Sequence, residues 1–389
     1  MDSSTSVGPI DLTQILSRAN GGETESQFQL GRMLHSGKEV PEDPSAAYQW
    51  ILKAAESNHP QAQALLASFH EKGIGTNADE RKSLEWLQKA ALRGEREAQY
   101  RLGLRLKEGG TVEKNPEAAI KWITKAAEQG HSPAQAELAT MYFLGDGIEE
   151  NHGRAFRWYA KAAGANNGEG IYGLGLMHDN GYHVPQDKGK ALEYFEKAAA
   201  LGHLPACLNS AAMLFLGEGI PQDLNLAEER LRQYLSQGKS AKRSDTGGFL
   251  TQVCTRLSEK IPKGSNLYAY QNAPGMKKKA AAETFLKPLL ERKDPVLLLY
   301  AHPGPGSESG FALGERGLAW KTNDAVARFE PFAWEGFSKM ELTDSEIILP
   351  GEPPIPFPLA TREQNLIFHL LSLLHRHTPK EEKNDLPAV

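Results

Sequence analysis

The sequence has few of the features that mark secreted, disulfide-bonded or membrane-spanning proteins. Only two of its 389 residues are cysteines, Cys207 and Cys254, which excludes a disulfide-stapled fold and favours a reducing, cytoplasmic environment. The first residues, MDSSTSVGPIDLTQIL, contain neither the basic segment nor the apolar core of a signal peptide. The apolar run from Val296 to Ala301 is far too short to span a bilayer.

The sequence also has no excess of one charge sign. Its 44 basic and 49 acidic residues give a net charge of -5, so nucleic acid and an anionic membrane are not expected as partners. Residues 239–279 are locally basic through Lys277, Lys278 and Lys279, which would suit nucleic acid or an acidic partner. No aromatic residues interleave with these charges as single-strand binding requires, and we favour a solvated linker.

A catalytic or metal-binding motif is missing as well. The segment GSESG carries Glu308 where a nucleophile elbow needs serine, and GPGSESG (residues 304–310) lacks the strand-to-helix context of a phosphate-binding loop. The twelve histidines form no HExxH pattern and no cluster with the cysteines. We expect no catalytic residues, no cofactor and no metal. The enzyme alternative is a hydrolase with a site between two domains.

What the sequence does have is a 36-residue repeat that runs from about residue 23 to 238 without an insertion. The tryptophans Trp50, Trp86, Trp122 and Trp158 lie 36 residues apart, and Tyr194 takes the next slot. A fixed period of this size indicates a helical solenoid, in which each unit buries its apolar face only against its neighbours. Such arrays bind partners and seldom carry chemistry.

Each unit predicts two helices, A and B, whose ends are marked by residues of one phase. Helix A stops at a glycine that fits a left-handed backbone position: Gly37, Gly73, Gly109, Gly145, Gly181 and Gly217. Helix B begins after an Asp or Asn that can cap it: Asp43, Asp79, Asn115, Asn151, Asp187 and Asp223. Helix B ends at a second Gly or Asn: Asn58, Gly94, Gly130, Asn166, Gly202 and Gly238.

Small residues at one phase of helix A predict close approach between helices, while the aromatic of helix B fills the wedge between repeats. The small residues are Gly31, Ala67, Gly103, Ala139, Gly175 and Ala211. The last repeat is degenerate, because Arg230 takes the aromatic slot.

Residues 9–20 are predicted as a lone capping helix in front of the first repeat. His59, His131 and His203 share one phase, which we interpret as a polar turn position rather than a metal array.

These residues resemble the Sel-one-like repeat family of the tetratricopeptide superfamily. The three parts of the family motif are visible as LGLMHDNG (residues 174–181), GEGIPQD (217–223) and WITKAAEQG (122–130). The resemblance covers residues 23–238. It implies an α solenoid, a right-handed superhelix of antiparallel helix pairs, that scaffolds protein–protein interactions without an activity of its own.

The period is lost after residue 238. We predict an N-terminal segment (1–22), the repeats (23–238), a junction (239–276), a small α+β domain (277–378) and a disordered tail (379–389). Strands are expected at 295–301, 310–321, 327–334, 337–342, 346–350 and 354–359, followed by an apolar helix at 362–376. This succession of strands closed by a C-terminal helix is similar to a bacterial pleckstrin-homology-like module. Its loop 302–310 lacks the basic residues that bind anionic head groups, so the resemblance implies protein binding or dimerisation.

By analogy with tetratricopeptide geometry, one stripe of helix A faces the concave side. We expect a protein partner to contact Phe28, Arg32, Tyr100, Leu104, Phe143, Tyr172, Leu176 and Phe215, with His35, Glu71, Lys107 and Asp179 interspersed. The alternative is that the superhelix curls tightly enough to bury many of them. The chain is thus expected to be a bacterial, cytoplasmic adaptor. Its C-terminal domain is expected to add a second protein contact or to form a homodimer. A narrower alternative is an immunity protein or secretion adaptor that neutralises or loads a toxin or effector.

Overall fold

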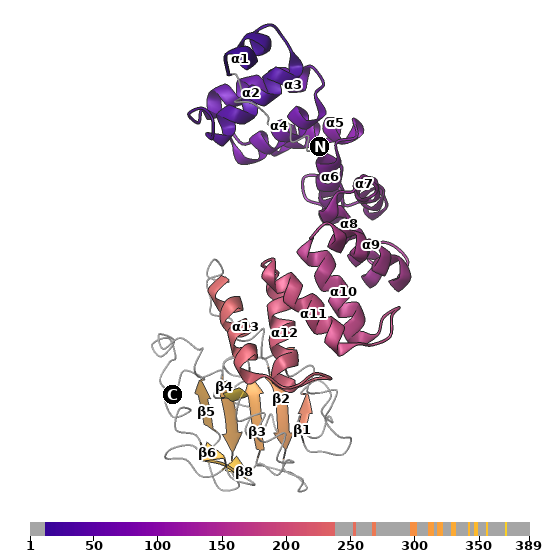
Figure 1. The fold of residues 1–389 in the computed structure, drawn as a ribbon, viewed down its shortest axis with the longest axis vertical. Coiled ribbons are helices and arrows are strands. Elements are labelled where there is room, and N and C mark those ends of the chain that lie inside the picture. Colours follow the sequence, from indigo (N-terminus) through magenta and orange to yellow (C-terminus); the bar gives the residue numbers. More distant parts are fainter. Residues whose placement is uncertain are drawn as a thin grey trace, which may run out of the picture. The chain divides into compact units, whose positions relative to one another are not determined.

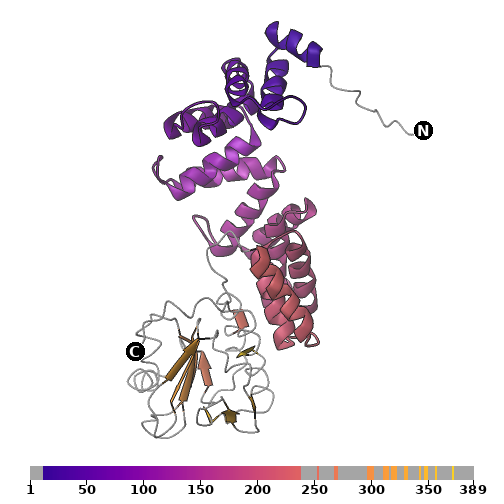
Figure 2. The same cartoon turned by 90° about the vertical axis from the view of Figure 1, so that its left-hand side faces the viewer.

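The computed structural model describes residues 12–237 and, beyond them, residues 252–253, 267–269, 296–301, 310–314, 317–321, 328–331, 341–342, 346–348, 355–356 and 370–371. The chain forms two compact units, Met1–Met177 with Tyr182–Val184, and His178–Gly181 with Pro185–Val389. Within each unit consecutive helices contact one another, from α1 to α9 in the first and from α11 to α13 in the second. Figure 1 and Figure 2 show these helices as successive hairpins.

Thirteen helices occupy residues 12–237 and confirm two helices per repeat. The first, α1, spans Leu12–Asn20 and lies where the predicted capping helix was expected. The A helices are α2 (Thr24–Ser36), α4 (Pro60–Lys72), α6 (Arg96–Glu108), α8 (Ser132–Leu144), α10 (Gly168–Asn180) and α12 (Leu204–Leu216). The B helices are α3 (Pro44–Glu56), α5 (Glu80–Leu92), α7 (Pro116–Glu128), α9 (His152–Gly164), α11 (Lys188–Ala200) and α13 (Leu224–Gln237).

The predicted helix ends are confirmed at the residues that marked them. In all six repeats the Asp or Asn before helix B accepts a hydrogen bond from the backbone N–H three residues later, at 2.8 to 3.0 Å. The glycine after each A helix has a φ between 60° and 85°. After helix B, the left-handed position is filled by Asn58, Gly94, Gly130, Asn166 and Gly202, while Gly238 lies outside the described residues.

Close packing between helices A and B explains the small residues. A Cβ on Gly31 would lie 2.7 Å from the side chain of Ile51, and one on Gly103 would lie 2.6 Å from Ile123. The predicted wedge role of the tryptophans is also confirmed, because Trp86 packs against the buried cluster of α2, α3 and α4. A lysine ammonium from the next turn lies over each of the four tryptophan rings, and for Lys89 it is 3.9 Å from the Trp86 centroid.

A buried glutamine links each of the first four A helices to the end of the preceding helix. Its amide nitrogen donates to the carbonyl oxygen eight residues earlier at 3.0 to 3.2 Å. These glutamines are Gln27, Gln63, Gln99 and Gln135, and their acceptors are Ala19, Ala55, Ala91 and Ala127. The last carbonyls of a helix have no partner within it, so this contact completes the helix end. Because Ala19 belongs to α1, this helix takes the place of a B helix.

Beyond residue 237 the described segments are mainly antiparallel strands. One sheet has the order β1 (Leu267–Ala269), β2 (Val296–Ala301), β3 (Gly310–Gly314), β4 (Gly317–Lys321) and β5 (Arg328–Pro331). The other has the order β6 (Glu341–Leu342), β7 (Glu346–Ile348) and β8 (Ile355–Pro356). Strands β2 to β8 fall inside the segments predicted as strands, whereas β1 falls in the predicted junction. Most of the helix predicted at 362–376, and the predicted disordered tail, lie outside the described residues.

The left-handed position after α7 makes a direct test of the repeat geometry. Gly130 has a φ of 79°, and a Cβ there would meet no atom within 4 Å. We expect Gly130→Val to lower the free energy of unfolding by about 1–3 kcal/mol, because a β-branched residue is strained at this φ. Gly130→Asn is the matched control, since Asn58 and Asn166 hold the same phase. Urea denaturation measures both; a valine variant that unfolds like wild type would contradict this geometry.

A second test addresses the buried glutamines. Gln99 donates to the Ala91 carbonyl at 3.1 Å and accepts from the Gln129 amide at 2.7 Å. Replacing it with the similarly shaped methionine, Gln99→Met, should lower the unfolding free energy by about 1–2 kcal/mol through loss of two hydrogen bonds. The exposed Gln61 provides the control, and Gln61→Met should change that value by less than about 0.5 kcal/mol. Equal denaturation midpoints for the two variants would argue against a structural role for Gln99.

Candidate functional site

The residues expected to contact a partner lie on the A helices, but not all of them are accessible. Tyr100, Leu104, Phe143, Tyr172 and Leu176 are half-buried, and Arg32 is exposed. We call these six residues the A-helix surface.

The remaining two expected contact residues are core residues, which corrects the prediction for them. Phe28 is 5% exposed and packs in the cluster that contains Ile51 and Leu66. Phe215 is fully buried on α12, where every residue from 206 to 216 is buried. At these two positions the alternative of burial holds, since residues of α3 and α4 cover Phe28 and the residues around Phe215 on α12 are themselves buried.

One position of the stripe follows a period of two repeats rather than one. An aromatic residue on α2, α6 and α10 recurs every 72 residues as Phe28, Tyr100 and Tyr172. The same position on α4 and α8 holds Ala64 and Ala136. The rings of the A-helix surface on α6 and α10 are therefore separated by a helix with a small side chain. A search for a 72-residue spacing in the sequence would have found this alternation.

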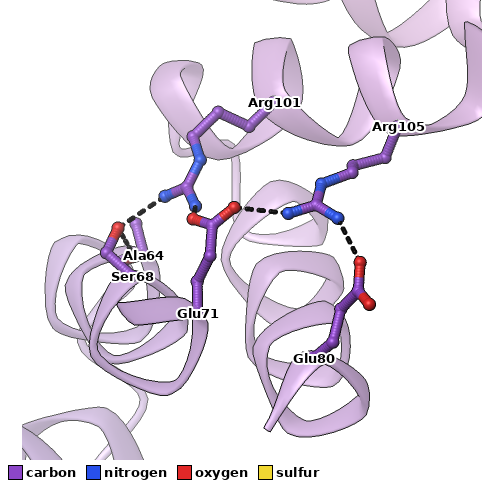
Figure 3. A network of polar contacts seen from close by, with 6 residues as sticks. All are labelled: Ala64, Ser68, Glu71, Glu80, Arg101 and Arg105. Carbon is purple, nitrogen blue, oxygen red and sulfur yellow. Dashed lines mark hydrogen bonds and ion pairs between the residues drawn. The ribbon is translucent and has the colours of Figure 1, made fainter. Parts of the chain in front are cut away.

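Ion pairs connect neighbouring A helices beside these rings. Glu71 on α4 accepts hydrogen bonds from Arg101, at 2.6 Å, and from Arg105, both on α6. Arg101 also donates to the Ser68 hydroxyl, and Arg105 to Glu80 at the start of α5, each at 2.6 Å. In Figure 3 the Glu71 carboxylate lies between the two guanidinium groups. Each arginine is thereby held by two partners.

A second ion-pair group lies one repeat further on. The Lys107 ammonium on α6 is 2.7 Å from Glu137 on α8 and 2.9 Å from Asp146. Burial disfavours the ammonium, but the bonds to both carboxylates outweigh it and raise the pKa of Lys107. In the second unit, Asp179 pairs with Lys188 at 2.9 Å. Of the charged residues expected in the stripe, Glu71, Lys107 and Asp179 are therefore paired within the chain.

An aromatic cluster surrounds Phe143 at the end of α8. The Tyr182 and His152 rings lie 5.4 and 5.3 Å from its centroid and 4.7 Å from each other. Tyr182 is 39% exposed, so the cluster reaches the surface. The sequence analysis missed Tyr182 because it lies in the loop after α10, outside the stripe. The signal was GYH at 181–183, where His183 adopts a φ of 63° in a slot that three other repeats fill with Gly75, Gly147 and Gly219.

The histidines of one phase also have a role that the sequence analysis did not predict. His59, His131 and His203 are not simply polar turn residues; each side chain caps the A helix that follows it. In the alternate repeats, the same position is filled by Glu95 and Asn167, whose side chains cap α6 and α10.

The chemistry of the A-helix surface is that of binding through rings, aliphatic groups and paired charges. Burial, and then the nearby Glu137, raise the pKa of Tyr100 to about 12, so its hydroxyl stays protonated and can donate a hydrogen bond. Among the described residues, no three His, Cys, Asp or Glu side chains come together as metal ligands. The helices in the described part of the chain are all too short or too polar to cross a bilayer.

A family model described as Sel1 repeat matches residues 24–59, 60–95, 96–131, 132–167, 168–203 and 204–229. Each match begins at the first residue of an A helix. The last match stops one residue before Arg230, which pairs with Glu196 at 2.6 Å in place of an aromatic contact. The family pattern and the helix pairs therefore have the same register.

Similar solved structures come from bacteria. A protective antigen of uropathogenic Escherichia coli strains, which displays an SLR fold, is 28% identical with a TM-score of 0.55, covering 66% of this chain and 53% of the antigen. This chain thus spans about half of the antigen's length. A Sel1 repeat protein from Oxalobacter formigenes is 27% identical with a TM-score of 0.54, covering 57% of this chain and 89% of that one.

An immunity protein from Pseudomonas aeruginosa is 21% identical over 55% of this chain and 82% of its own, with a TM-score of 0.35. Its likeness is too low to support a functional argument. No curated protein matches the chain. The Sel1 repeat model matches more than half of the chain, in register with its helix pairs, and the chain therefore belongs to the Sel1 repeat family.

Proposed function

We propose that this protein is a non-enzymatic adaptor that binds a protein partner through the A-helix surface of its first compact unit. Sel1 repeat proteins are protein-interaction scaffolds. The observation that carries the proposal is that half-buried rings and aliphatic side chains lie on α6, α8 and α10 beside ion pairs that are already formed.

The spacing of these side chains suits a binding surface. Tyr100 and Leu104 lie one turn apart on α6, and Tyr172 and Leu176 repeat that pair on α10. Tyrosine rings supply large contact areas at a small cost in conformational entropy, and they are frequent binding hot spots. The ion pairs of Arg101 and Lys107 hold the neighbouring charged side chains in place. A partner would therefore meet a surface that needs little reordering.

The C-terminal strands support a second part of the proposal. Strands β2 to β8 occupy the segments expected for a small α+β domain at residues 277–378, and all their pairings are antiparallel. We propose that this domain resembles a pleckstrin-homology-like module and supplies a second protein contact or a homodimer interface. The loop at 302–310 contains no Lys or Arg, which argues against lipid head groups as its ligand.

The proposed setting is the cytoplasm of a bacterium. The two cysteines fit a reducing compartment, and the similar structures from Escherichia coli and Oxalobacter formigenes are bacterial. If the partner is a toxin or effector, the adaptor would act as an immunity protein or a secretion chaperone. A toxin encoded beside its gene would favour that narrower role, and unrelated neighbouring genes would weaken it.

Replacing the two tyrosines of the A-helix surface tests whether this surface binds the partner. A Tyr100→Ala/Tyr172→Ala protein should recover its partner from a lysate of the source organism at least about tenfold less well than wild type, because each hot-spot ring contributes more than about 1 kcal/mol. Quantitative mass spectrometry of the captured proteins measures this. Binding of the purified partner to both proteins should then show the same ratio of dissociation constants.

Two controls separate binding from folding. Leu92→Ala removes a side chain that is 75% exposed at the end of α5, outside the A-helix surface, and should leave recovery unchanged. Tyr100→Phe/Tyr172→Phe keeps both rings and should retain most of the binding. A partner that the alanine variant captures as well as wild type would place the site elsewhere. Absence of any stoichiometric partner would reopen the enzyme alternative.

A further inference from the structure

Two histidines in the first unit each accept a hydrogen bond from a backbone N–H group that has no partner within its own helix. The Nδ1 atoms of His59 and His131 accept from the backbone N–H groups of Ala62 and Ala134, at 3.2 and 3.3 Å. These amides lie in the first turns of α4 and α8, where no earlier carbonyl of the helix can pair with them. Each imidazole is thus the N-cap, and capping requires Nδ1 to carry a lone pair.

The other ring nitrogen reaches the preceding repeat. The Nε2 atom of His59 lies 3.0 Å from a carboxylate oxygen of Glu25 on α2, and that of His131 lies 2.8 Å from Glu97 on α6. The hydrogen bonds from these imidazoles lower the pKa of both carboxyl groups. An ionised carboxylate only accepts, so the imidazole proton lies on Nε2 and Nδ1 is bare.

The surroundings of the two rings are alike. His59 lies 4.5 Å from the Phe28 ring and His131 lies 5.0 Å from the Tyr100 ring, each ring being three residues after the glutamate. Both imidazoles are largely buried, with side chains 14% and 10% exposed. The other charged groups that face these sites are Arg32 near Glu25, and Arg96 and Arg101 near Glu97. Near Tyr100 they are Glu137, Lys107 and Glu108.

We propose that His59 and His131 are proton-sensitive latches at alternate repeat junctions. Protonation fills the Nδ1 lone pair, so the cap of α4 or α8 is lost, while the Nε2 contact to the preceding repeat is kept. A cation at a helix N-terminus is also unfavourable. The attraction to Glu25 or Glu97 favours the protonated imidazole and is weakened by solvent, because those carboxylate side chains are about half exposed.

The role of Nδ1 as the capping atom decides whether the caps of α4 and α8 are lost at low or at high pH. Imidazoles as a class change charge between pH 5 and 8. The cap exists only while Nδ1 carries its lone pair, so adding a proton to the imidazole removes it. The first turns of α4 and α8 therefore open on acidification. This latch does not depend on what binds the A-helix surface, although His131 lies against Tyr100.

The chain contains its own control. In α10 the same N-cap position holds Asn167, whose side-chain oxygen accepts from the Gly170 amide at 2.9 Å. An asparagine amide does not titrate in this range, so α10 has the same cap geometry without the proton sensitivity. The latch therefore predicts a difference between α8 and α10 in one molecule.

Native-state hydrogen exchange, read by NMR on the deuterated full chain at pH 7.5 and 5.5, tests the latch. After correction for intrinsic rates, protection of the Ala134 amide should fall on the order of fivefold relative to the Gly170 amide. This ratio corresponds to the stability that a typical N-cap gives its helix. Long-range proton–nitrogen correlations at pH 7.5 should show neutral His131 protonated on Nε2. An unchanged ratio, or a proton on Nδ1, would overturn the proposal.

Two variants sharpen the result. His131→Asn, which copies the cap of α10, should keep Ala134 protected at both pH values. Glu97→Gln retains an acceptor for Nε2 but removes the carboxylate that favours the protonated imidazole, so it should reduce the loss of protection at pH 5.5. A His131→Asn protein that still loses protection like wild type, or a Glu97→Gln protein that loses more, would refute the latch.

Discussion

Each helix pair of this chain has an apolar face that only the next pair can cover, and the remaining features depend on how closely the pairs stack. Contact is close enough that a single Cβ on Gly31 or Gly103 would collide with an isoleucine of the paired helix. Trp86 closes the other side by packing on the cluster of the preceding repeat. An insertion within a repeat would displace both contacts together, which accounts for a period of 36 residues without exceptions.

Close stacking also decides how polar groups at the repeat junctions are satisfied. Helix ends carry backbone groups without partners in the helix, and these ends lie where repeats meet. Gln99 completes the end of α5, while His131 caps α8 and reaches Glu97 on the previous A helix. Because a histidine does this in alternate repeats and Glu95 or Asn167 in the others, consecutive junctions of the same fold have different responses to protons.

The same spacing creates the proposed binding surface. Adjacent A helices lie close enough for Arg101 and Arg105 to share Glu71, and for Lys107 to reach Glu137. These pairs are partly exposed and contribute little to stability. Their consequence is a surface on which charges are already matched beside half-buried rings, so a partner gains from contact with the rings rather than from unpaired charge.

The sequence by itself determined the repeat, the helix boundaries and the residues at the helix ends. These features depend on short-range backbone chemistry: Asp43 caps the helix that begins one residue later, and Asn58 takes the left-handed position just after it ends. Tertiary structure decided which rings are exposed. Phe28 is core although Tyr100, at the same phase two repeats later, is only half-buried, because exposure depends on the side chains that other helices pack around each ring. It also decided the partners of His131, since its bond to Glu97 joins residues 34 positions apart.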